Sequence, residues 1–155
     1  MSIERARKYF SKWNLQDRMM EFEVSSATVE LAAEAVGCEP ERIAKTLSFI
    51  VDGECILIVT AGDRKIDNTK YKAQFNTKAK MLSPEDVEET VGHGIGGVCP
   101  FGINEGVTVY LDESLKRFNM VYPACGSASS AIGLSTTELE KYSNSKAWVD
   151  VCKER

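Results

Sequence analysis

Two adjacent apolar segments joined by an Asp-Gly pair constrain the fold more than any other feature of the sequence. Residues 45–51 and 54–60 are rich in Ile, Leu, Val and Thr, and Asp52-Gly53 between them is a strong signal for a two-residue hairpin turn. Both segments are apolar on both faces, so we expect other elements to cover both sides of them. The sequence therefore predicts a β-hairpin at the centre of a sheet.

The other segments predict helices and strands in alternation around this hairpin. Ile3, Ala6, Phe10 and Trp13 recur at helical spacing, which predicts an amphipathic helix at the N-terminus. Further helices are expected over residues 27–36, 68–75, 84–91 and from 135 onward, and further strands around 20–24, 107–111, 118–122, 131–134 and 147–151. Because the hairpins make the sheet mixed, we expect an α+β fold and not a doubly wound one.

Three positions predict how individual helices begin and end. Gly37 can adopt the left-handed backbone conformation that ends a helix. Ser83-Pro84-Glu85-Asp86 and Ser135-x-x-Glu138 place a hydroxyl at the N-cap and a carboxylate three residues later, the spacing of a capping box.

Length and composition are those of one ordinary globular domain. The chain has 155 residues, of which 43% are hydrophobic and 27% charged, and we expect a single domain over residues 1–155. No apolar run is long enough to span a membrane, and the N-terminus is charged where a secretory signal is apolar, so a cytoplasmic location without membrane contact is expected. Five cysteines without a Cys-x-x-Cys pair favour reduced thiols over disulfides or zinc ligands.

The charge distribution argues against indiscriminate nucleic-acid binding. The net charge is −4, whereas such binding needs many Lys and Arg contacts to phosphate groups. Residues 62–80 depart from this average, with six basic side chains and two acidic ones. A small basic face of this kind suits one RNA end, although a solvated helix surface has the same composition.

Two glycine-bearing loops are candidates for binding a ligand through the backbone. They span residues 92–102 and 123–130, and each follows a predicted regular element. Glycine allows consecutive N–H groups to approach a phosphate or a developing oxyanion, but a pair of tight surface turns would have the same composition. The first loop follows a helix and lacks Lys-Ser/Thr, so it fits neither the dinucleotide fingerprint nor the P-loop.

Three side chains could take part in chemistry. Lys45 opens an apolar central strand, either as a charge at the end of the strand or as an ammonium group placed to contact a phosphate or carbonyl oxygen. His93 is the only histidine and could pair with Cys99 as a Cys/His nucleophile. Cys125 could be a reactive thiol or simply a small residue in a tight turn.

Three motifs taken in order resemble one known family. They are Arg42-Ile43-Ala44-Lys45-Thr46-Leu47, then GGVCPFG at Gly96 to Gly102, then YPACGS at Tyr122 to Ser127 followed by Ile132-Gly133-Leu134-Ser135. Together they resemble the YbaK/ProX family of freestanding aminoacyl-tRNA deacylases, which are related to the insertion editing domain of bacterial prolyl-tRNA synthetases. The resemblance extends from about Ser25 to Leu139.

The resemblance implies hydrolysis of mischarged aminoacyl-tRNA in a pocket on a mixed, curved sheet. The family's classical substrate is tRNA for proline that carries a smaller amino acid such as alanine or cysteine, and prolyl-tRNA synthetase is an implied partner. No metal or other cofactor is implied. Lys45 matches the family's essential lysine, Gly96 and Pro100 match its Gly-x-x-x-Pro loop, and Gly126 matches the second substrate-facing loop.

On this basis Lys45 is the expected catalytic residue, and the two loops provide the expected substrate contacts. The expected substrate-binding residues are Thr46, His93, Gly96, Gly97, Pro100, Phe101, Gly102, Cys125, Gly126 and Ser127. An aminoacyl ester is already activated, so a positioned water or the substrate's own side chain could act without an enzyme nucleophile.

Two other classes of function remain open at this point. One is a module that binds the tRNA 3′ end or an aminoacyl-nucleotide without turnover. The other is a thiol enzyme built on Cys99 or Cys125, for which Lys45 would be dispensable.

Overall fold

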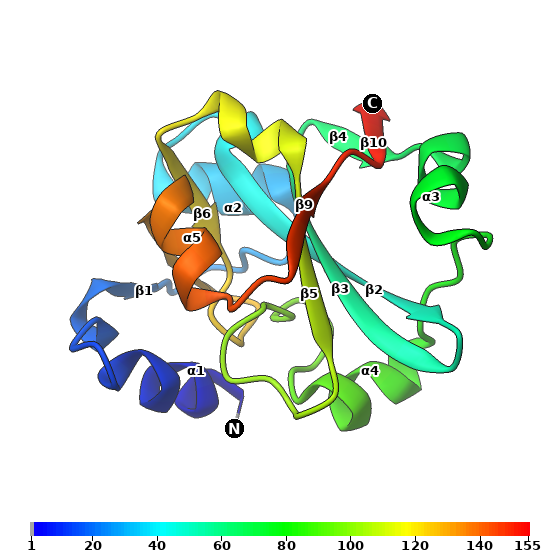
Figure 1. The fold of residues 1–155 in the computed structure, drawn as a ribbon. Coiled ribbons are helices and arrows are strands. Elements are labelled where there is room, and N and C mark those ends of the chain that lie inside the picture. Colours follow the sequence, from blue (N-terminus) through cyan, green and yellow to red (C-terminus); the bar gives the residue numbers. More distant parts are fainter. Residues whose placement is uncertain (1) are drawn as a thin grey trace.

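The computed structural model describes residues 2–155, whose main feature is a curled, mixed sheet of six strands with helices packed around it (Figure 1). The strand order is β8-β6-β2-β3-β5-β9. The strands are β2 (Ile43–Val51), β3 (Glu54–Ala61), β5 (Thr108–Asp112), β6 (Met120–Pro123), β8 (Leu134–Ser135) and β9 (Ala147–Val149). The predicted α+β class, the mixed sheet and the central position of the hairpin are confirmed.

A tight turn at Asp52-Gly53 sets the register of the hairpin. Asp52 and Gly53 have φ angles of 51° and 79°, the paired left-handed conformations of a type I′ turn. Val51 therefore lies opposite Glu54, and pairing continues without a bulge to Ala44 and Ala61. The hairpin thus presents a fixed set of side chains to each face of the sheet.

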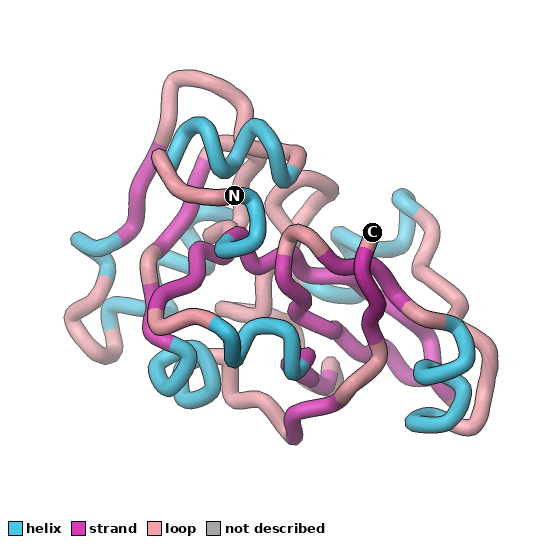
Figure 2. The backbone as a smooth tube through the Cα atoms, turned by 90° about the horizontal axis from the view of Figure 1, so that it is seen from above, coloured by secondary structure: helices cyan, strands magenta, loops and turns pink. Residues whose placement is uncertain are grey.

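Both faces of the hairpin are covered, as the sequence predicts. Leu57 and Val59 are fully buried in a cluster with Phe10 of the first helix and Leu139 of the last. On the opposite face, Ile56 and Ile58 pack in a second cluster with the buried Tyr71. Figure 2 shows the result from above, with the helices around the periphery of the strands.

The helices lie where the sequence predicts them, with small shifts at their ends. They are α1 (Ser2–Ser11), α2 (Val29–Val36), α3 (Asn68–Phe75), α4 (Pro84–Val91) and α5 (Thr136–Tyr142), with short 3-10 turns η1 (Gln16–Arg18), η2 (Pro40–Arg42) and η3 (Glu113–Arg117). Gly37 ends α2 with a φ of 86°, and Asp67 caps α3 through Oδ1. Within residues 2–155, no helix has the length and apolarity that crossing a membrane requires.

One predicted capping box forms and the other does not. The Ser135 hydroxyl accepts from Glu138 N–H at 3.0 Å, and the Glu138 carboxylate accepts from Ser135 N–H at 2.9 Å. At the start of α4, the Ser83 hydroxyl instead donates to the Asp86 carboxylate at 2.9 Å and makes no cap bond to the backbone. Asp is one methylene shorter than the Glu of a capping box, so its carboxylate stays beside the hydroxyl.

Two short ribbons outside the main sheet modify the strand predictions. The strand expected around 20–24 is β1 (Met19–Glu21), which pairs with β7 (Ser130–Ile132), and Gly133 separates β7 from β8. The second ribbon, β4 (Arg64–Ile66) with β10 (Cys152–Glu154), was not predicted. Its two strands have three residues each and are mostly charged, so they lack the apolar alternation that predicts a strand.

We expect Glu138→Gln to destabilise the protein at neutral pH and to destabilise it less as the solution is acidified. Arg18 donates to the Glu138 carboxylate at 2.8 Å and, with Ser135, holds its pKa at about 2, below the roughly 4.3 of an unfolded chain. A carboxyl whose folded pKa is depressed adds stability above the unfolded value and loses it as the pH falls toward the folded value.

The measurement is the free energy of unfolding of both proteins in urea at several pH values between 7 and 3. Glu138→Gln should be the less stable protein at pH 7, and the difference should shrink as the pH falls. A difference that is constant with pH would show that the carboxylate charge contributes nothing.

Candidate functional site

The edge of β2 that faces away from β3 is covered at both ends and bare in the middle. Strand β6 pairs with it only at Ile43 and Ala44. At the other end, Ile50 N–H donates to the Lys80 carbonyl at 2.9 Å, and Ser48 accepts from the Leu82 N–H at 3.3 Å. The described residues supply no strand beside 45–47 on this edge.

The hairpin register determines which backbone groups lie at the bare edge. Because Val51 and Glu54 close a two-residue turn, odd-numbered residues of β2 exchange hydrogen bonds with β3. Thr46 therefore directs its N–H and C=O away from β3, toward the gap. Its hydroxyl is also buried, with no hydrogen-bond partner among residues 2–155. The backbone N–H and C=O of Thr46 are thus available to a ligand, whereas its hydroxyl is closed to one in this conformation.

A cavity of about 420 Å³ lies against this edge. Its walls come from residues preceding and within α2, from β2, from the start of α4, from the loop around Ile95 to Val98, and from β6 and the segment after it. Most of the lining side chains are apolar, and none is a carboxylate. This volume and this lining are typical of a small-molecule or cofactor site.

Lys45 supplies the cation of the cavity wall. Its side chain is half-buried, and Nζ donates to the Arg64 carbonyl in β4 at 2.5 Å. Burial lowers the pKa of the Lys45 ammonium, and the nearby Arg155 lowers it further. An ammonium group has three donors, so two protons remain for a ligand after the bond to Arg64.

The two glycine loops meet backbone to backbone beside the cavity. A Cβ on Gly97 would lie 2.5 Å from the backbone nitrogen of Ser127 and 2.6 Å from the carbonyl carbon of Gly126, closer than a side chain allows. Gly96 lines the cavity with a φ of 87°. The loops therefore form one wall because glycine is present where they touch.

The structure divides the predicted site residues into three groups. Lys45, Thr46 and Gly96 line the 420 Å³ cavity. A neighbouring hollow of about 200 Å³ is lined by Gly97, Gly126 and Ser127 together with Ile3, Glu88 and Gly94. The remaining residues, His93, Pro100, Phe101, Gly102 and Cys125, do not line the cavity.

The residues of this last group hold the first loop against the core. His93 and Phe101 are fully buried, and His93 Nε2 lies 2.6 Å from the Phe101 carbonyl. Since a carbonyl only accepts, Nε2 carries the proton. Pro100 and Gly102 border a groove along α1, and a Cβ on Gly102 would lie 2.8 Å from the Arg5 carbonyl oxygen. Cys125 is fully buried as well.

His93 and Cys99 lie together without the properties of a nucleophilic pair. Cys99 Sγ is 3.5 Å from His93 Nε2, but burial raises the pKa of the Cys99 thiol to about 12 and lowers the pKa of His93. The thiol is therefore protonated at neutral pH and closed to solvent. Within residues 2–155 no group of three or more His, Cys, Asp or Glu side chains is placed to hold a metal ion.

Several cavity residues were not among the predicted site residues. Met81 and Ile95 lie at the cavity and are 55% and 65% exposed, unusual for large hydrophobic side chains. Val29 on α2 and Tyr122 on β6 complete the walls. An apolar residue has the same appearance in a sequence whether it faces a core or a ligand, so neither the loop that contains Ile95 nor the motif that begins at Tyr122 marked these two as site residues.

Comparisons with known proteins relate this chain to one family. The profile of the family described as "Aminoacyl-tRNA editing domain" matches residues 23–142. The uncharacterised protein YwhH of Bacillus subtilis strain 168 is 56% identical over 155 residues, 99% of each chain. Proline--tRNA ligase of Geobacillus sp. strain WCH70 is 29% identical over 100 residues, 64% of this chain but 17% of the ligase.

The solved structures agree with the family profile. A crystal structure of a candidate trans-editing enzyme for prolyl tRNA synthetase superposes with a TM-score of 0.88 and 27% identity, covering 98% of this chain and 97% of that one. The crystal structure of the hypothetical protein APE2540 has a TM-score of 0.80 at 22% identity, with 94% and 99% coverage, and shows the shared fold.

Gly97→Ala should be much more disruptive than Gly94→Ala. The new Cβ at position 97 would meet backbone atoms of the second loop, whereas at position 94 the nearest atom is Glu88 Oε1 at 3.5 Å, an ordinary contact. We expect Gly97→Ala to lower the free energy of unfolding by about 2 kcal/mol. The matched Gly94→Ala control should change it by no more than about 0.5 kcal/mol. Urea denaturation measures both, and equal effects would rule out tight contact between the loops.

The cysteines of the native protein should differ sharply in reactivity. Cys38 is partly exposed, whereas Cys55, Cys99, Cys125 and Cys152 are buried, and all five are free. Iodoacetamide at neutral pH, followed by mass spectrometry, should therefore label Cys38 first and the others only after unfolding. Rapid labelling of Cys99 in the native protein would restore the thiol-enzyme hypothesis.

Proposed function

This chain belongs to the aminoacyl-tRNA editing domain family, and we propose that it deacylates mischarged aminoacyl-tRNA. The proposed substrate is tRNA for proline that carries a small wrong amino acid such as alanine or cysteine. The likeness to the crystal structure of a candidate trans-editing enzyme for prolyl tRNA synthetase supports a freestanding role beside such a synthetase. We place the activity in the cytoplasm, where charged tRNA is used.

One observation carries the proposal: a half-buried ammonium group stands beside unpaired backbone groups in a cavity of about 420 Å³. Lys45 keeps two donors free after its bond to Arg64, and Thr46 adds a backbone N–H donor at the bare edge of β2. An aminoacyl ester at a tRNA 3′ end presents carbonyl, ribose hydroxyl and phosphate oxygens. These are acceptors that such donors bind.

The chemistry follows from this donor set. Water attacks the ester carbonyl, negative charge develops on the carbonyl oxygen, and the ribose oxygen leaves with a proton. Lys45 and the Thr46 N–H stabilise that charge in a site shielded by apolar walls, where each hydrogen bond counts for more than it does in water. No enzyme nucleophile is required, because an aminoacyl ester is reactive once it is held and oriented.

The glycine loops act as the opposite wall of the site. Gly96 lines the cavity directly, while the contact of Gly97 with Gly126 and Ser127 fixes the position of the loop. His93 and Phe101 support the same loop from the core through the 2.6 Å contact between Nε2 and the carbonyl. In this proposal the remaining predicted residues act on the substrate through the shape of the loop.

The cavity lining supports an uncharged amino acid as the part of the substrate that is recognised. Val29, Leu47 and Val98 are among the apolar lining residues, and no lining carboxylate is present to pair with a cationic side chain. Apolar walls separate residues that differ by one methyl group by only about 1–3 kcal/mol. Alanine, cysteine and serine should therefore differ in rate by degree.

Deacylation assays with Lys45 variants test the proposal. The substrates are tRNA for proline charged with alanine, cysteine, serine or proline, and the proteins are wild type, Lys45→Ala, Lys45→Arg and the control Lys146→Ala. Lys146 is exposed and does not line the cavity. Lys45→Ala should slow hydrolysis of the preferred ester by about a hundredfold or more, as expected when one charge-stabilising donor is lost. Lys146→Ala should match wild type.

The outcomes separate the candidate functions. If Lys45→Ala keeps full activity, the assigned role of the cation is wrong. If wild type binds charged tRNA but hydrolyses none of the esters, nor those of other tRNAs, the chain is a binding module without turnover. If Cys99→Ser abolishes activity while Lys45→Ala does not, the thiol enzyme is correct.

A further inference from the structure

One segment carries a charge opposite to that of the rest of the chain. We call residues 64–80 the lysine arm, which comprises β4, α3 and the segment leading to Met81. It holds six cations, Arg64, Lys65, Lys70, Lys72, Lys78 and Lys80, against the single carboxylate of Asp67, a net charge of +5. Since the whole chain carries −4, the remainder carries −9.

Most of this charge is not neutralised within the protein. Arg64 is near Asp63 and Glu154, at 3.6 and 3.9 Å, and Lys70 pairs with Asp150 at 3.1 Å. The carboxylate of Asp67 accepts from the backbone N–H groups that open α3. Within residues 2–155, no hydrogen bond or ion pair involves the exposed side chains of Lys65, Lys72, Lys78 or Lys80.

The lysine arm also presents a recess whose lining includes cationic, amide and hydroxyl side chains. A hollow of about 720 Å³ is lined by Asn68, Thr69, Lys72, Ala73, Asn76, Lys78 and Ala79. Ammonium, amide and hydroxyl groups are all hydrogen-bond donors to phosphate and ribose oxygens, and no carboxylate lines the recess to repel a phosphate group.

Aromatic packing holds the lysine arm in place. Tyr71 of α3 is fully buried, with its ring 5.2 Å from that of Phe49 and 4.8 Å from that of Phe75. The Phe75 ring in turn lies 5.2 Å from Tyr110 on β5. Lys70 and Lys72 therefore project from a helix that is already packed on the sheet, and a ligand does not have to order this helix.

Both ends of the lysine arm reach the cavity. At its start, the Arg64 carbonyl accepts the hydrogen bond from Lys45. At its end, the Lys80 carbonyl accepts from Ile50, and the next residue, Met81, bridges to Phe49 and lines the cavity. A polymer whose end lies in the cavity can therefore continue along the lysine arm.

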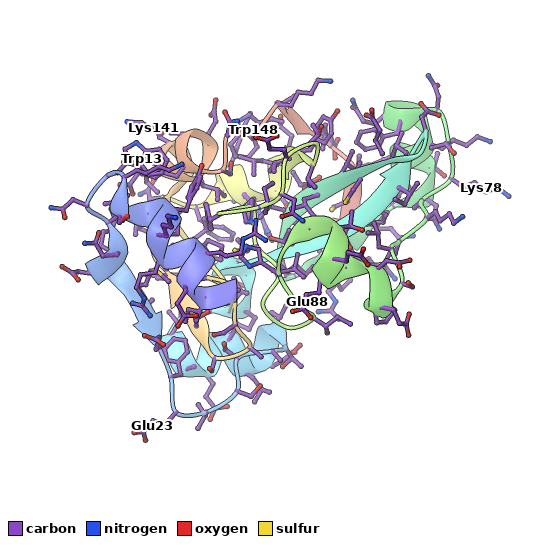
Figure 3. All side chains as sticks on the ribbon, turned by 90° about the horizontal axis from the view of Figure 1, so that it is seen from below. Trp13, Glu23, Lys78, Glu88, Lys141 and Trp148 are labelled. Atoms are coloured by element: carbon purple, nitrogen blue, oxygen red, sulfur yellow. The ribbon has the colours of Figure 1, made fainter. Side chains whose placement is uncertain are left out.

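A second group of basic side chains, from α1, the residue after it and α5, has partners within the protein. Lys12 lies over the Tyr9 ring at 4.7 Å, Lys141 over the Tyr142 ring at 5.4 Å, and Arg7 pairs with Glu21 at 2.8 Å. In Figure 3, Lys141 and Trp13 lie together on the side of the molecule opposite Lys78. This region therefore provides a control with cations of the same kind on another face.

We propose that the lysine arm binds the sugar-phosphate backbone of the RNA whose 3′ end enters the cavity. The inference rests on the proposed function. It adds to that function a surface that binds the part of the tRNA outside the cavity. Recognition of this kind reads phosphate groups and not bases, so it contributes affinity that is independent of sequence and depends on salt.

The test is a binding titration with uncharged tRNA for proline at several NaCl concentrations, followed by fluorescence anisotropy. The variants are Lys72→Glu with Lys78→Glu and, as the control with the same change of net charge, Lys12→Glu with Lys141→Glu. The arm variant should bind at least about tenfold more weakly at low salt. The plot of the log of its association constant against the log of the salt concentration should be less steep, with a slope smaller in magnitude by about 1.5, as expected for two lost phosphate contacts. The control should bind within about threefold of wild type.

Equal weakening of both double variants would overturn the proposal, because net charge alone would then account for binding. Unchanged binding by the arm variant would overturn it as well, as expected if the lysine arm instead meets an acidic protein. A further pair, Lys72→Ala with Lys78→Ala, removes the cations without placing new carboxylates near the end of α3. It should show the same direction of change with an unaltered circular dichroism spectrum.

Hydrolysis assays keep this inference distinct from the proposed function. For the arm variant, the loss of activity on charged full-length tRNA should exceed the loss on a short aminoacylated CCA oligonucleotide by at least about tenfold. Equal losses would overturn the proposal. If wild type hydrolyses neither substrate, the proposed function fails, and the titration with uncharged tRNA still decides whether the lysine arm binds RNA.

Discussion

The two-residue turn at Asp52-Gly53 determines the geometry on which the rest of the site depends. A two-residue turn permits one register for the hairpin, and this register decides which backbone groups of β2 face β3 and which face outward. Thr46 is an outward-facing residue at the stretch where neither β6 nor the segment before α4 reaches. A shift of one residue would instead direct the groups of Lys45 and Leu47 into the gap and reverse the faces of all β2 side chains.

The second constraint is the contact between two loops that are about thirty residues apart in sequence. Their backbones approach so closely at Gly97 and Gly126 that the position of each loop depends on the other. The first loop is fixed on its inner side by His93 and Phe101, and the second by the Ser130 hydroxyl, which accepts from Cys125 N–H at 3.1 Å. The wall that these two loops form is therefore held in place although it is not built from a helix. In this arrangement glycine permits close packing more than it provides flexibility.

The sequence predicted most elements whose signals are local. The Asp52-Gly53 hairpin, the cap at Asp67 and the capping box at Ser135 depend on residues within a few positions of one another, and each forms as expected. The ribbon of β4 and β10 was missed because it joins segments about ninety residues apart that carry charges at most positions. No pattern within either segment indicates its partner.

The site could be predicted only in part, for a related reason. A cation in an apolar strand drew attention to Lys45, the family resemblance made it the expected catalytic residue, and it lines the cavity. His93 and Phe101 belong to the same loop as Gly96 but are buried in the core, since neighbouring residues of a loop can face opposite directions. A motif identifies a segment and not the direction of each side chain. The bare edge of β2 depends on where β6 ends, which only the assembled sheet reveals.

The bond from Lys45 to Arg64 links the cation of the cavity to a weak part of the fold. Strand β4 pairs with β10 over only three residues, and Lys65 lies directly opposite Lys153, a like-charge pair that disfavours the ribbon. Short edge ribbons of this kind open locally at a lower free energy than global unfolding requires. An anion beside Lys65 would offset the repulsion and hold the ribbon closed. An anion in that position would thereby also hold in place the Arg64 carbonyl that accepts from the Lys45 ammonium.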